Sequence, residues 1–464
     1  MSQTHATDEE SLIELALRSA SDTRVLVART AARYEAAGVF SAQFGSAPAV
    51  VVADENTFAA AGRDVCDSLI RAGHSQKRPF IFGPQIFAED DCTRELQTAL
   101  AADDAVPIAV GSGTINDLTK LAAHRLKRPY MVVATAASMD GYTAFGASIT
   151  ANGSKQTFDC PAPRAVLADL DVIAAAPQAM NAAGYADLAA KIAAGADWIL
   201  ADALGVEPIE PSVWDTVQRL LPTWIAAPGG IAGNDPNCLR RLVNGLMMSG
   251  FAMQAARSSR PASGADHQFS HLWDMQHHTH SGAAPSHGFK VGIGTLASLA
   301  LYEYLLRTDL AHLNVEEAVE KWPTLKILEA QIATLLGTGE LADKARDESR
   351  AKYISVHTLR GQLARLREVW PDLRAKLARQ LIPCRQMQAM LREAGCPCEP
   401  EQIGISRDRL RLSYQQALFI RRRFTVLDVA HRAGLLETSL QHLFGPGGLW
   451  SSAASIARQS RSAD

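Results

Sequence analysis

Apolar runs rich in β-branched residues alternate with helical stretches over the first third of the chain. The clearest run, from Ala47 to Ala53, ends at Asp54. Strands buried on both faces read as continuous apolar runs, and strands that alternate with helices build a parallel sheet covered by helices. The sequence therefore predicts a mostly parallel α/β sheet. Its expected strands lie at residues 47–53, 78–84, 105–110 and 129–135, and the expected helices between them near 58–72, 92–102 and 118–127.

The pattern changes at Pro177, beyond which the apolar spacing is helical almost throughout. Before it, residues 147–158 with Asn152-Gly153 at their centre predict a hairpin. Residues 8–36 are expected to be helical, as are 315–336 and most later segments. We therefore expect an α/β domain over residues 1–176 and an all-helical domain over residues 177–464.

Composition restricts the class of protein. The chain has 464 residues, a formal charge of −3 and 20% charged residues, which is unlike a nucleic-acid binder or a disordered protein. Its seven cysteines are scattered without zinc-finger spacing, and the acidic N-terminus lacks an apolar signal core. No uninterrupted apolar run reaches the ~18 residues of a membrane helix. We expect reduced thiols, a cytoplasmic location, no membrane insertion and a small-molecule partner.

A glycine-containing turn follows the strand expected at 105–110. It reads Gly111-Ser112-Gly113-Thr114-Ile115-Asn116-Asp117 and leads into a helix. Glycines at such a turn let the backbone approach a phosphate, which the helix N-terminus then binds through free N–H groups. Asn116 stands where a dinucleotide motif has its third glycine, so a plain structural turn is the alternative.

A second loop follows the strand at 129–135 and reads Ala136-Ala137-Ser138-Met139-Asp140-Gly141-Tyr142-Thr143. Open α/β sheets bind ligands at the carboxyl ends of their strands. Asp140 is therefore a candidate to contact a substrate hydroxyl, although an Asp before Gly is also common in simple turns.

Six of the thirteen histidines lie between Ser263 and Thr295. His267 and His271 are four residues apart and would share one face of a helix, and His287 follows just before an apolar segment. Neutral imidazole binds zinc, iron or nickel. Three interpretations remain: a solvated loop, which we favour for His277, His278 and His280; a site of histidines alone; and a mixed site that includes a carboxylate.

Asp187 is the leading candidate for that carboxylate. It lies among small apolar residues on an expected helix, in AGYADLAAKIAAGADW. A lone acid on an apolar surface is costly unless it is paired or coordinated. The alternative is a partly exposed Asp that caps a turn.

Together these segments resemble a known family. GSGTIND, ATAASMDGYT, AGYADLAAKIAAGADW, SGADHQFSHLWD and HGFKVGIGT occur in the order found in the sn-glycerol-1-phosphate dehydrogenases. This family belongs to the superfamily of iron-containing alcohol dehydrogenases, glycerol dehydrogenases and dehydroquinate synthases. The resemblance covers residues 40–435 and is greatest to its bacterial branch. It implies a dehydroquinate synthase-like fold and a homodimer.

The resemblance also implies roles for single residues. Asp187, His267 and His287 correspond to metal ligands for zinc, nickel or iron, with one divalent metal per chain. His271 and Asp140 correspond to catalytic, substrate-contacting residues, and Asp187 also lies at the substrate. Residues matching the NAD(H)- or NADP(H)-binding segments are Asp54, Gly111, Gly113, Thr114, Ile115, Asn116, Asp117, Thr135 and Ser138. Two departures are Ala144, where relatives often have Ser, and Phe289, where many superfamily members have Glu.

The activity that the resemblance implies is reversible reduction of dihydroxyacetone phosphate to sn-glycerol 1-phosphate. The product would enter an ether lipid or another glycerophosphate polymer. Asp54 would suit a ribose hydroxyl and repel a 2′-phosphate, which favours NADH. The alternatives are a glycerol or polyol dehydrogenase, a dehydroquinate-synthase-like lyase and a non-catalytic nucleotide-binding relative. His271 in place of His267 as the metal ligand is a further alternative.

Overall fold

The computed structural model describes residues 3–83, 86–151 and 154–451, which pack into two compact units. The first unit comprises Met1–Ala189, Pro211–Ala262 and Glu393–Cys396, and the second comprises Ala190–Glu210, Ser263–Arg392 and Pro397–Asp464. The predicted boundary between residues 176 and 177 falls inside the first unit, where strands give way to helices. These units follow from packing alone, so the functional domains stay a prediction.

A six-stranded sheet forms the centre of the first unit. Its strand order is β1-β8-β5-β4-β2-β3, and every neighbouring pair is parallel. Parallel pairing sets the carboxyl ends of all six strands along one edge, where ligands bind in sheets of this kind. The strands are β1 (Val25–Arg29), β2 (Ala49–Asp54), β3 (Phe80–Phe82), β4 (Val106–Gly111), β5 (Met131–Ala134) and β8 (Ala165–Asp169).

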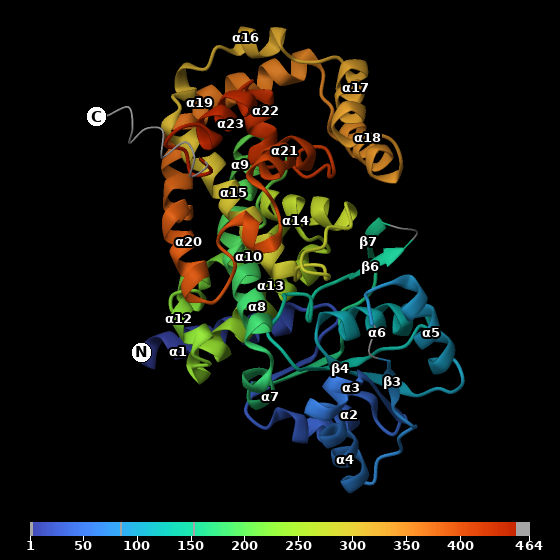
Figure 1. Cartoon of the computed structure of the whole chain (residues 1–464). Coiled ribbons are helices and arrows are strands. Elements are labelled where there is room, and N and C mark those ends of the chain that lie inside the picture. Colours follow the sequence, from blue (N-terminus) through green and yellow to red (C-terminus); the bar gives the residue numbers. More distant parts are fainter. Residues whose placement is uncertain (1–2, 84–85, 152–153, 452–464) are drawn as a thin grey trace. The chain divides into compact units, whose positions relative to one another are not determined.

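Helices cover both faces of this sheet (Figure 1). Figure 1 shows α2 (Ala36–Phe44) and α4 (Arg63–Arg71) on one face, and α5 (Asp90–Leu100) and α6 (Gly113–Arg125) on the other. Phe40 and Leu69 from the first face pack into a buried cluster with the β-branched residues of the strands. Removal of this apolar surface from water stabilises the layered arrangement. The predicted α/β class with a parallel sheet is confirmed.

The expected hairpin is present as β6 (Ala147–Ala151) and β7 (Ser154–Phe158), which pair antiparallel from Ala147 opposite Phe158 to Ala151 opposite Ser154. The predicted turn residues Asn152 and Gly153 lie outside the described residues.

The continuous helix predicted over residues 8–36 is wrong. The structure has α1 (Gln3–Ser19), the strand β1, a 3-10 turn at Ala32–Glu35 and then α2. Val25 to Arg29 pair with Ala165 to Asp169 of β8. Strand pairing with a distant segment overrode a loose helical spacing, and the β-branched residues of VLVAR favour that outcome.

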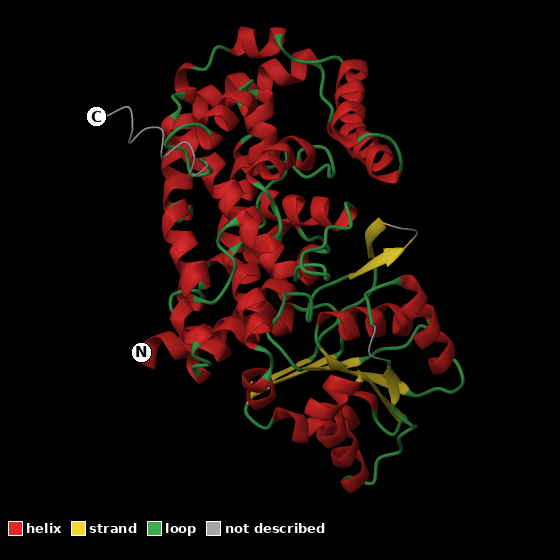
Figure 2. Ribbon diagram, in the orientation of Figure 1, coloured by secondary structure: helices red, strands yellow, loops and turns green. Residues whose placement is uncertain are grey.

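Beyond β8 all named elements of the described chain are helices (Figure 2). The single helix predicted over 315–336 is two helices, because Pro323 lies between them and cannot donate a helical hydrogen bond. The first unit holds α7 (Leu170–Ala175), α8 (Gln178–Ala189), α10 (Pro211–Gln218), α11 (Leu221–Trp224), α12 (Pro228–Ala232) and α13 (Pro236–Ala256). The second holds α9 (Lys191–Ala203), α14 (Ala265–Met275), α15 (His287–Arg307), α16 (Val315–Glu320), α17 (Leu325–Leu336), α18 (Glu340–Lys352), α19 (Val356–Gln380), nearly all of α20 (Cys384–Glu393), α21 (Arg407–Ala417), α22 (Val426–Arg432) and α23 (Leu436–Phe444).

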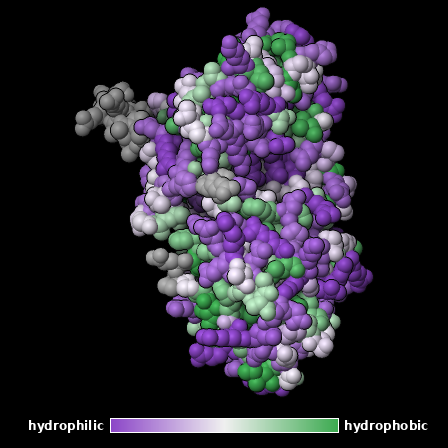
Figure 3. All heavy atoms as spheres, turned by 90° about the vertical axis from the view of Figure 1, so that its right-hand side faces the viewer, coloured by the Kyte–Doolittle hydropathy of each residue, from purple (hydrophilic) through white to green (hydrophobic). Residues whose placement is uncertain are grey.

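One described helix, α15, is long and apolar enough by composition to cross a membrane, and 78% of its apolar window is buried inside the protein. It is therefore a core helix of the second unit. On the face drawn in Figure 3, hydrophilic residues predominate and hydrophobic ones lie in scattered groups.

All seven cysteines are free thiols, as expected. Cys92 and Cys238 are partly exposed. The buried thiols are Cys66, Cys160, Cys384, Cys396 and Cys398.

Candidate active site

The glycine turn lies at the carboxyl end of β4. Gly111 ends the strand, Ser112 is the N-cap residue and α6 begins at Gly113. A Cβ atom on Gly111 would stand 2.5 Å from Cβ of Ile115, so the turn has no room for a side chain there. The Ser112 side chain makes no capping hydrogen bond, which leaves the first amides of α6 without that partner. A turn of this kind can bind a phosphate with its backbone.

Two predicted cofactor residues in this turn have partners within the fold. The buried Asn116 accepts a hydrogen bond from the Tyr130 hydroxyl at 3.1 Å. Asp117 accepts from the backbone N–H of Ser148 at 3.1 Å, and burial raises the pKa of its carboxyl group. These contacts connect the turn to Tyr130, directly before β5, and to β6. A contact with the cofactor stays a prediction for both residues.

Other predicted cofactor residues lie at the same edge of the sheet. Thr135, directly after β5, is buried and donates its N–H to the Gly111 carbonyl at 3.2 Å. Asp54 ends β2 and caps the next helix, with its Oδ1 accepting from the Thr57 N–H at 2.8 Å. Ser138 is partly exposed in the loop after β5. The parallel strands thus bring these segments together.

Asp140 is held from two sides within the first unit. Its carboxylate accepts a hydrogen bond from the Ser249 hydroxyl of α13 at 2.8 Å. Its backbone N–H donates to Oδ2 of Asp187 at 3.1 Å. Asp187 lies on α8 and is fully buried. The loop after β5 therefore orients a buried carboxylate, and Asp187 is not the exposed turn residue that was the alternative.

The histidine pair lies on α14 in the second unit. His267 is buried, and its Nδ1 is hydrogen-bonded to Asp266. Asp266 also accepts from the Gly264 N–H at 3.1 Å. A carboxylate on Nδ1 holds the proton there, which makes Nε2 the nitrogen that can coordinate a metal.

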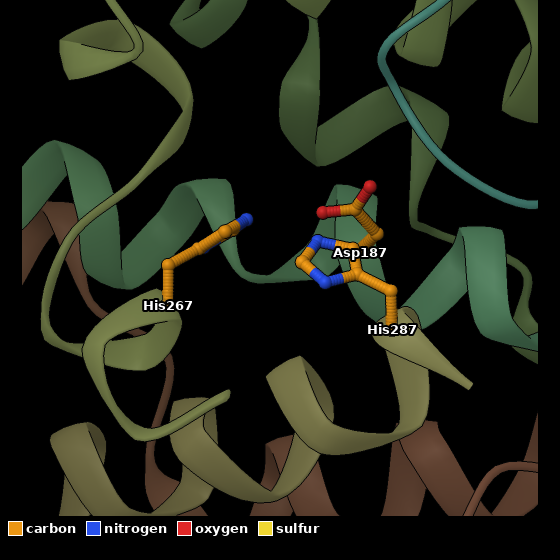
Figure 4. Close-up of side chains that lie close together, drawn as sticks. All are labelled: Asp187, His267 and His287. Carbon is orange, nitrogen blue, oxygen red and sulfur yellow. The ribbon is translucent and has the colours of Figure 1, made fainter. Parts of the chain in front are cut away.

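Asp187, His267 and His287 each offer a ligand atom, and these atoms all lie within 4.8 Å of one another (Figure 4). Figure 4 shows the carboxylate and both rings pointing toward one another. One carboxylate and two neutral imidazoles suit a divalent metal such as zinc, nickel or iron. The donor set therefore fits the expected metal.

The other histidines of this stretch divide into three cases. The ring centroid of His271 lies 6.1 Å from those of both His267 and His287, and His271 is not among the three clustered ligands. His277 and His280 are exposed, as predicted. The solvated position predicted for His278 is wrong: its Nε2 lies 2.6 Å from the Ile403 carbonyl oxygen, and burial lowers the pKa of its ring.

Comparison with known proteins gives the chain its relatives. The profile of a family described as iron-containing alcohol dehydrogenase matches residues 27–177. A glycerol-1-phosphate dehydrogenase [NAD(P)+] from Geobacillus thermodenitrificans is 30% identical over 392 residues, which is 84% of this chain and 87% of that protein. The chain belongs to the glycerol-1-phosphate dehydrogenase family.

Further relatives agree with this placement in the family. A glycerol-1-phosphate dehydrogenase [NAD(P)+] from Bacillus subtilis is 30% identical over 388 residues, covering 82% of this chain and 84% of its own length. A solved structure, described as a probable glycerol dehydrogenase from Sinorhizobium meliloti, superposes with a TM-score of 0.58 at 15% identity. It covers 90% of this chain and 98% of its own, and at that identity it shows the fold alone.

Three buried charged residues contact the segments that carry the candidate site residues, and none of the three was predicted from the sequence. Asp197 of α9 is fully buried and accepts from the Ala265 N–H at 2.7 Å, the Val426 N–H at 2.7 Å and the Tyr302 hydroxyl at 2.6 Å. Asp266 orients His267, and Lys120 of α6 is buried beside the Asp140 loop. The signal that singled out Asp187, an acid among small apolar residues, also applies to Asp197.

Proposed function

We propose that the protein is a metal-dependent oxidoreductase that reduces dihydroxyacetone phosphate to sn-glycerol 1-phosphate with NADH or NADPH. The observation that carries this proposal is the cluster of Asp187, His267 and His287 in a chain whose relatives are named glycerol-1-phosphate dehydrogenase [NAD(P)+]. One divalent ion per chain and a cytoplasmic homodimer are part of the proposal.

Each side of the site has its own task. A divalent cation held by Asp187, His267 and His287 would polarise the substrate ketone, and the reduced nicotinamide would supply the hydride. The backbone of the Gly111–Asp117 turn binds the pyrophosphate, and Asp54 accepts from the adenosine ribose. Its Oδ1 already caps a helix, so Oδ2 is the oxygen that meets the ribose and repels a 2′-phosphate. We therefore propose NADH as the preferred cofactor.

Two residues act on the substrate oxygens. His271 follows His267 by one helical turn and lies about 6 Å further along the helix, which suits a group that delivers a proton to the oxygen of the reduced carbonyl. Asp140 approaches from the loop after β5 and orients a substrate hydroxyl. The carbonyl carbon gains a hydride and its oxygen gains a proton, which balances the reduction.

The test is to mix the purified protein with dihydroxyacetone phosphate and NADH or NADPH and to follow loss of the reduced cofactor. We expect net oxidation of NADH, and in reverse the oxidation of sn-glycerol 1-phosphate but not of its enantiomer. Turnover of glycerol without a phosphate requirement would instead identify a polyol dehydrogenase. No net redox change with any ketone or polyol would exclude a dehydrogenase.

Variants separate the two histidines. Asp140→Asn and His271→Ala should keep the metal and NADH binding and lose about two orders of magnitude in ketone reduction, the usual scale for an acid–base group. If His271→Ala purifies without metal and His267→Ala purifies with it, the roles of the two histidines are exchanged. Elemental analysis identifies the metal, and sedimentation tests the dimer.

A further inference from the structure

Lys120 is a buried ammonium group on the helix that starts at the glycine turn. Its side chain has 0% exposure, and Nζ donates to the carbonyl oxygens of Gly141 at 3.0 Å, Ala144 at 2.9 Å and Gly146 at 2.9 Å. The nearest carboxylate oxygen, Oδ1 of Asp117, is 3.9 Å away. A buried charge is tolerated when its donors are satisfied, and here three carbonyls match the three donors of the ammonium.

The three carbonyls belong to the loop that carries Asp140. The first of them, on Gly141, directly follows Asp140 in the chain and also lies 3.4 Å from the Asn116 side-chain amide. On the other side of Asp140, its backbone N–H donates to Asp187 at 3.1 Å. Lys120 therefore fixes the backbone at Gly141, and the preceding residue, Asp140, holds the proposed metal ligand Asp187 through its N–H.

Helix α13 closes this arrangement from a third direction. The Ser249 hydroxyl holds the Asp140 carboxylate at 2.8 Å, and the Thr143 hydroxyl donates to the Met247 carbonyl at 2.6 Å. A Cβ atom on Gly250 would stand 2.8 Å from the Asp140 carbonyl oxygen, so the helix backbone touches the loop directly. The loop has little freedom to shift while these contacts and the Lys120 bonds are in place.

We propose that Lys120 is a positioning residue that holds Asp140 at the substrate and, through the Asp140 amide, sets the carboxylate of Asp187. This inference rests on the proposed function for the roles of Asp140 and Asp187. It adds that α6 serves both halves of the reaction: its first turn meets the nucleotide, and Lys120, seven residues after Gly113, fixes the substrate loop. Ser249 supports the same loop from α13.

The experiment compares Lys120→Met and Ser249→Ala with the wild-type enzyme. Met keeps the length of the side chain but removes the ammonium group that donates to all three carbonyls. We expect kcat/KM for dihydroxyacetone phosphate to fall about 100-fold in Lys120→Met, because a small misplacement of a positioned group has that effect. Ser249→Ala removes one hydrogen bond to a carboxylate, for which we expect about a 10-fold loss.

Two further measurements separate positioning from general damage. The NADH dissociation constant, measured by fluorescence, should stay within about twofold of wild type, because the three carbonyls that Lys120 binds follow Ser138 in the chain and the first turn of α6 stays in place. Zn²⁺ titrated into chelator-treated protein should bind about 10-fold more weakly to Lys120→Met, because Asp187 has lost its fixed partner. Ser439→Ala removes an equally buried hydroxyl that donates to the Leu436 carbonyl within α23, and it should change none of these values.

The proposal is overturned if Lys120→Met keeps wild-type kcat/KM and Zn²⁺ affinity, or if its NADH affinity falls as far as its kcat/KM. If Lys120→Met does not fold, Ser249→Ala decides: unchanged kcat/KM and Zn²⁺ affinity would reject the positioned loop. If the wild type reduces no dihydroxyacetone phosphate, the proposed function fails, and Zn²⁺ and NADH affinities in the variants still test the link between Lys120 and Asp187.

Discussion

A glycine lies at the N-terminus of both α6 and α14, but the backbone amides at the two N-termini have different partners. Helix α6 begins at Gly113, whereas α14 begins at Ala265, directly after Gly264. The N-cap residues are Ser112 for α6 and Gly264 for α14, and neither gives a side-chain cap. At α14, buried carboxylates of the same chain occupy the amides: Asp197 binds the Ala265 N–H, and Asp266 binds the Gly264 N–H. At α6, the Ser112 hydroxyl makes no capping hydrogen bond.

The difference shows that a glycine before a helix does not by itself indicate a ligand site. The positive end of the helix dipole attracts an anion, and that anion can be a bound phosphate or an internal carboxylate. At α14 internal carboxylates bind the amides at the helix start, and the proposed metal-binding groups are the histidine side chains that follow. At α6 the backbone itself is the proposed binding group.

The largest expected effect comes from substitution of the three proposed metal ligands. Asp187→Ala, His267→Ala and His287→Ala should each abolish metal retention and reduce turnover by at least about three orders of magnitude, because the remaining two ligands cannot hold the ion. Metal per chain by elemental analysis and the rate of NADH oxidation check this. The exposed His277→Ala is the matched control and should be silent. A variant that keeps one tightly bound metal would remove that residue from the site.

Asp197→Asn tests whether the internal carboxylate fixes α14. The carboxylate accepts three hydrogen bonds in a fully buried position, and the neutral amide replaces one acceptor oxygen by a donor. We expect a loss of about 3 kcal/mol in the free energy of unfolding. Denaturant titration measures it. Tyr302→Phe, which removes one of the three donors, should cost about 1 kcal/mol. Equal stability of Asp197→Asn and wild type would show that Asp197 does not fix the start of α14.

Gly111→Ala tests whether the backbone of the glycine turn before α6 binds the cofactor. The added methyl group would stand 2.5 Å from Cβ of Ile115 and would push the turn out of place. We expect NADH affinity to fall about 10-fold, or about 1.4 kcal/mol, while metal retention stays unchanged. Isothermal calorimetry checks the affinity. Gly38→Ala, where a Cβ meets nothing within 4 Å, is the control. Loss of metal in Gly111→Ala would show that the glycine turn and the proposed metal ligands are not independent.

The smallest effect concerns a buried polar atom that has no internal partner. Nε2 of His431 makes no hydrogen bond among the described residues, and burial lowers the pKa of this ring to about 4. Unfolded histidine titrates near 6.5, so between these values the unfolded chain binds more protons. The stability contribution is therefore present above about pH 6.5 and is lost as the pH falls toward 4.

Denaturant titration at pH 7 and pH 5 measures this contribution. We expect the free energy of unfolding to fall between pH 7 and pH 5 by about 1 kcal/mol less in His431→Phe than in wild type, with allowance for the partial exposure of the ring. An identical pH dependence in the two proteins would show that His431 is free to protonate in the folded state.

The sequence predicted those features that depend on neighbouring residues. The apolar strands, the glycine turn and the spacing of His267 and His271 are local patterns, and each lies where it was expected. The strand at Val25–Arg29 was missed because it forms by pairing with β8, about 140 residues away. Partners of buried charges are equally non-local, so the environments of Lys120, Asp197 and His278 could not be predicted.

The burial of the thiols has a practical consequence for spectroscopy. Thiol reagents attack the thiolate, and burial raises the pKa of Cys66 to about 11 and that of Cys160 to about 12. The pKa of Cys238 is also raised, by partial burial and by its hydrogen bond with Asp235. Cys92, partly exposed on α5, is therefore the thiol that a maleimide dye meets first. A fluorescent reporter can be attached there, beside α6, without removal of any native cysteine.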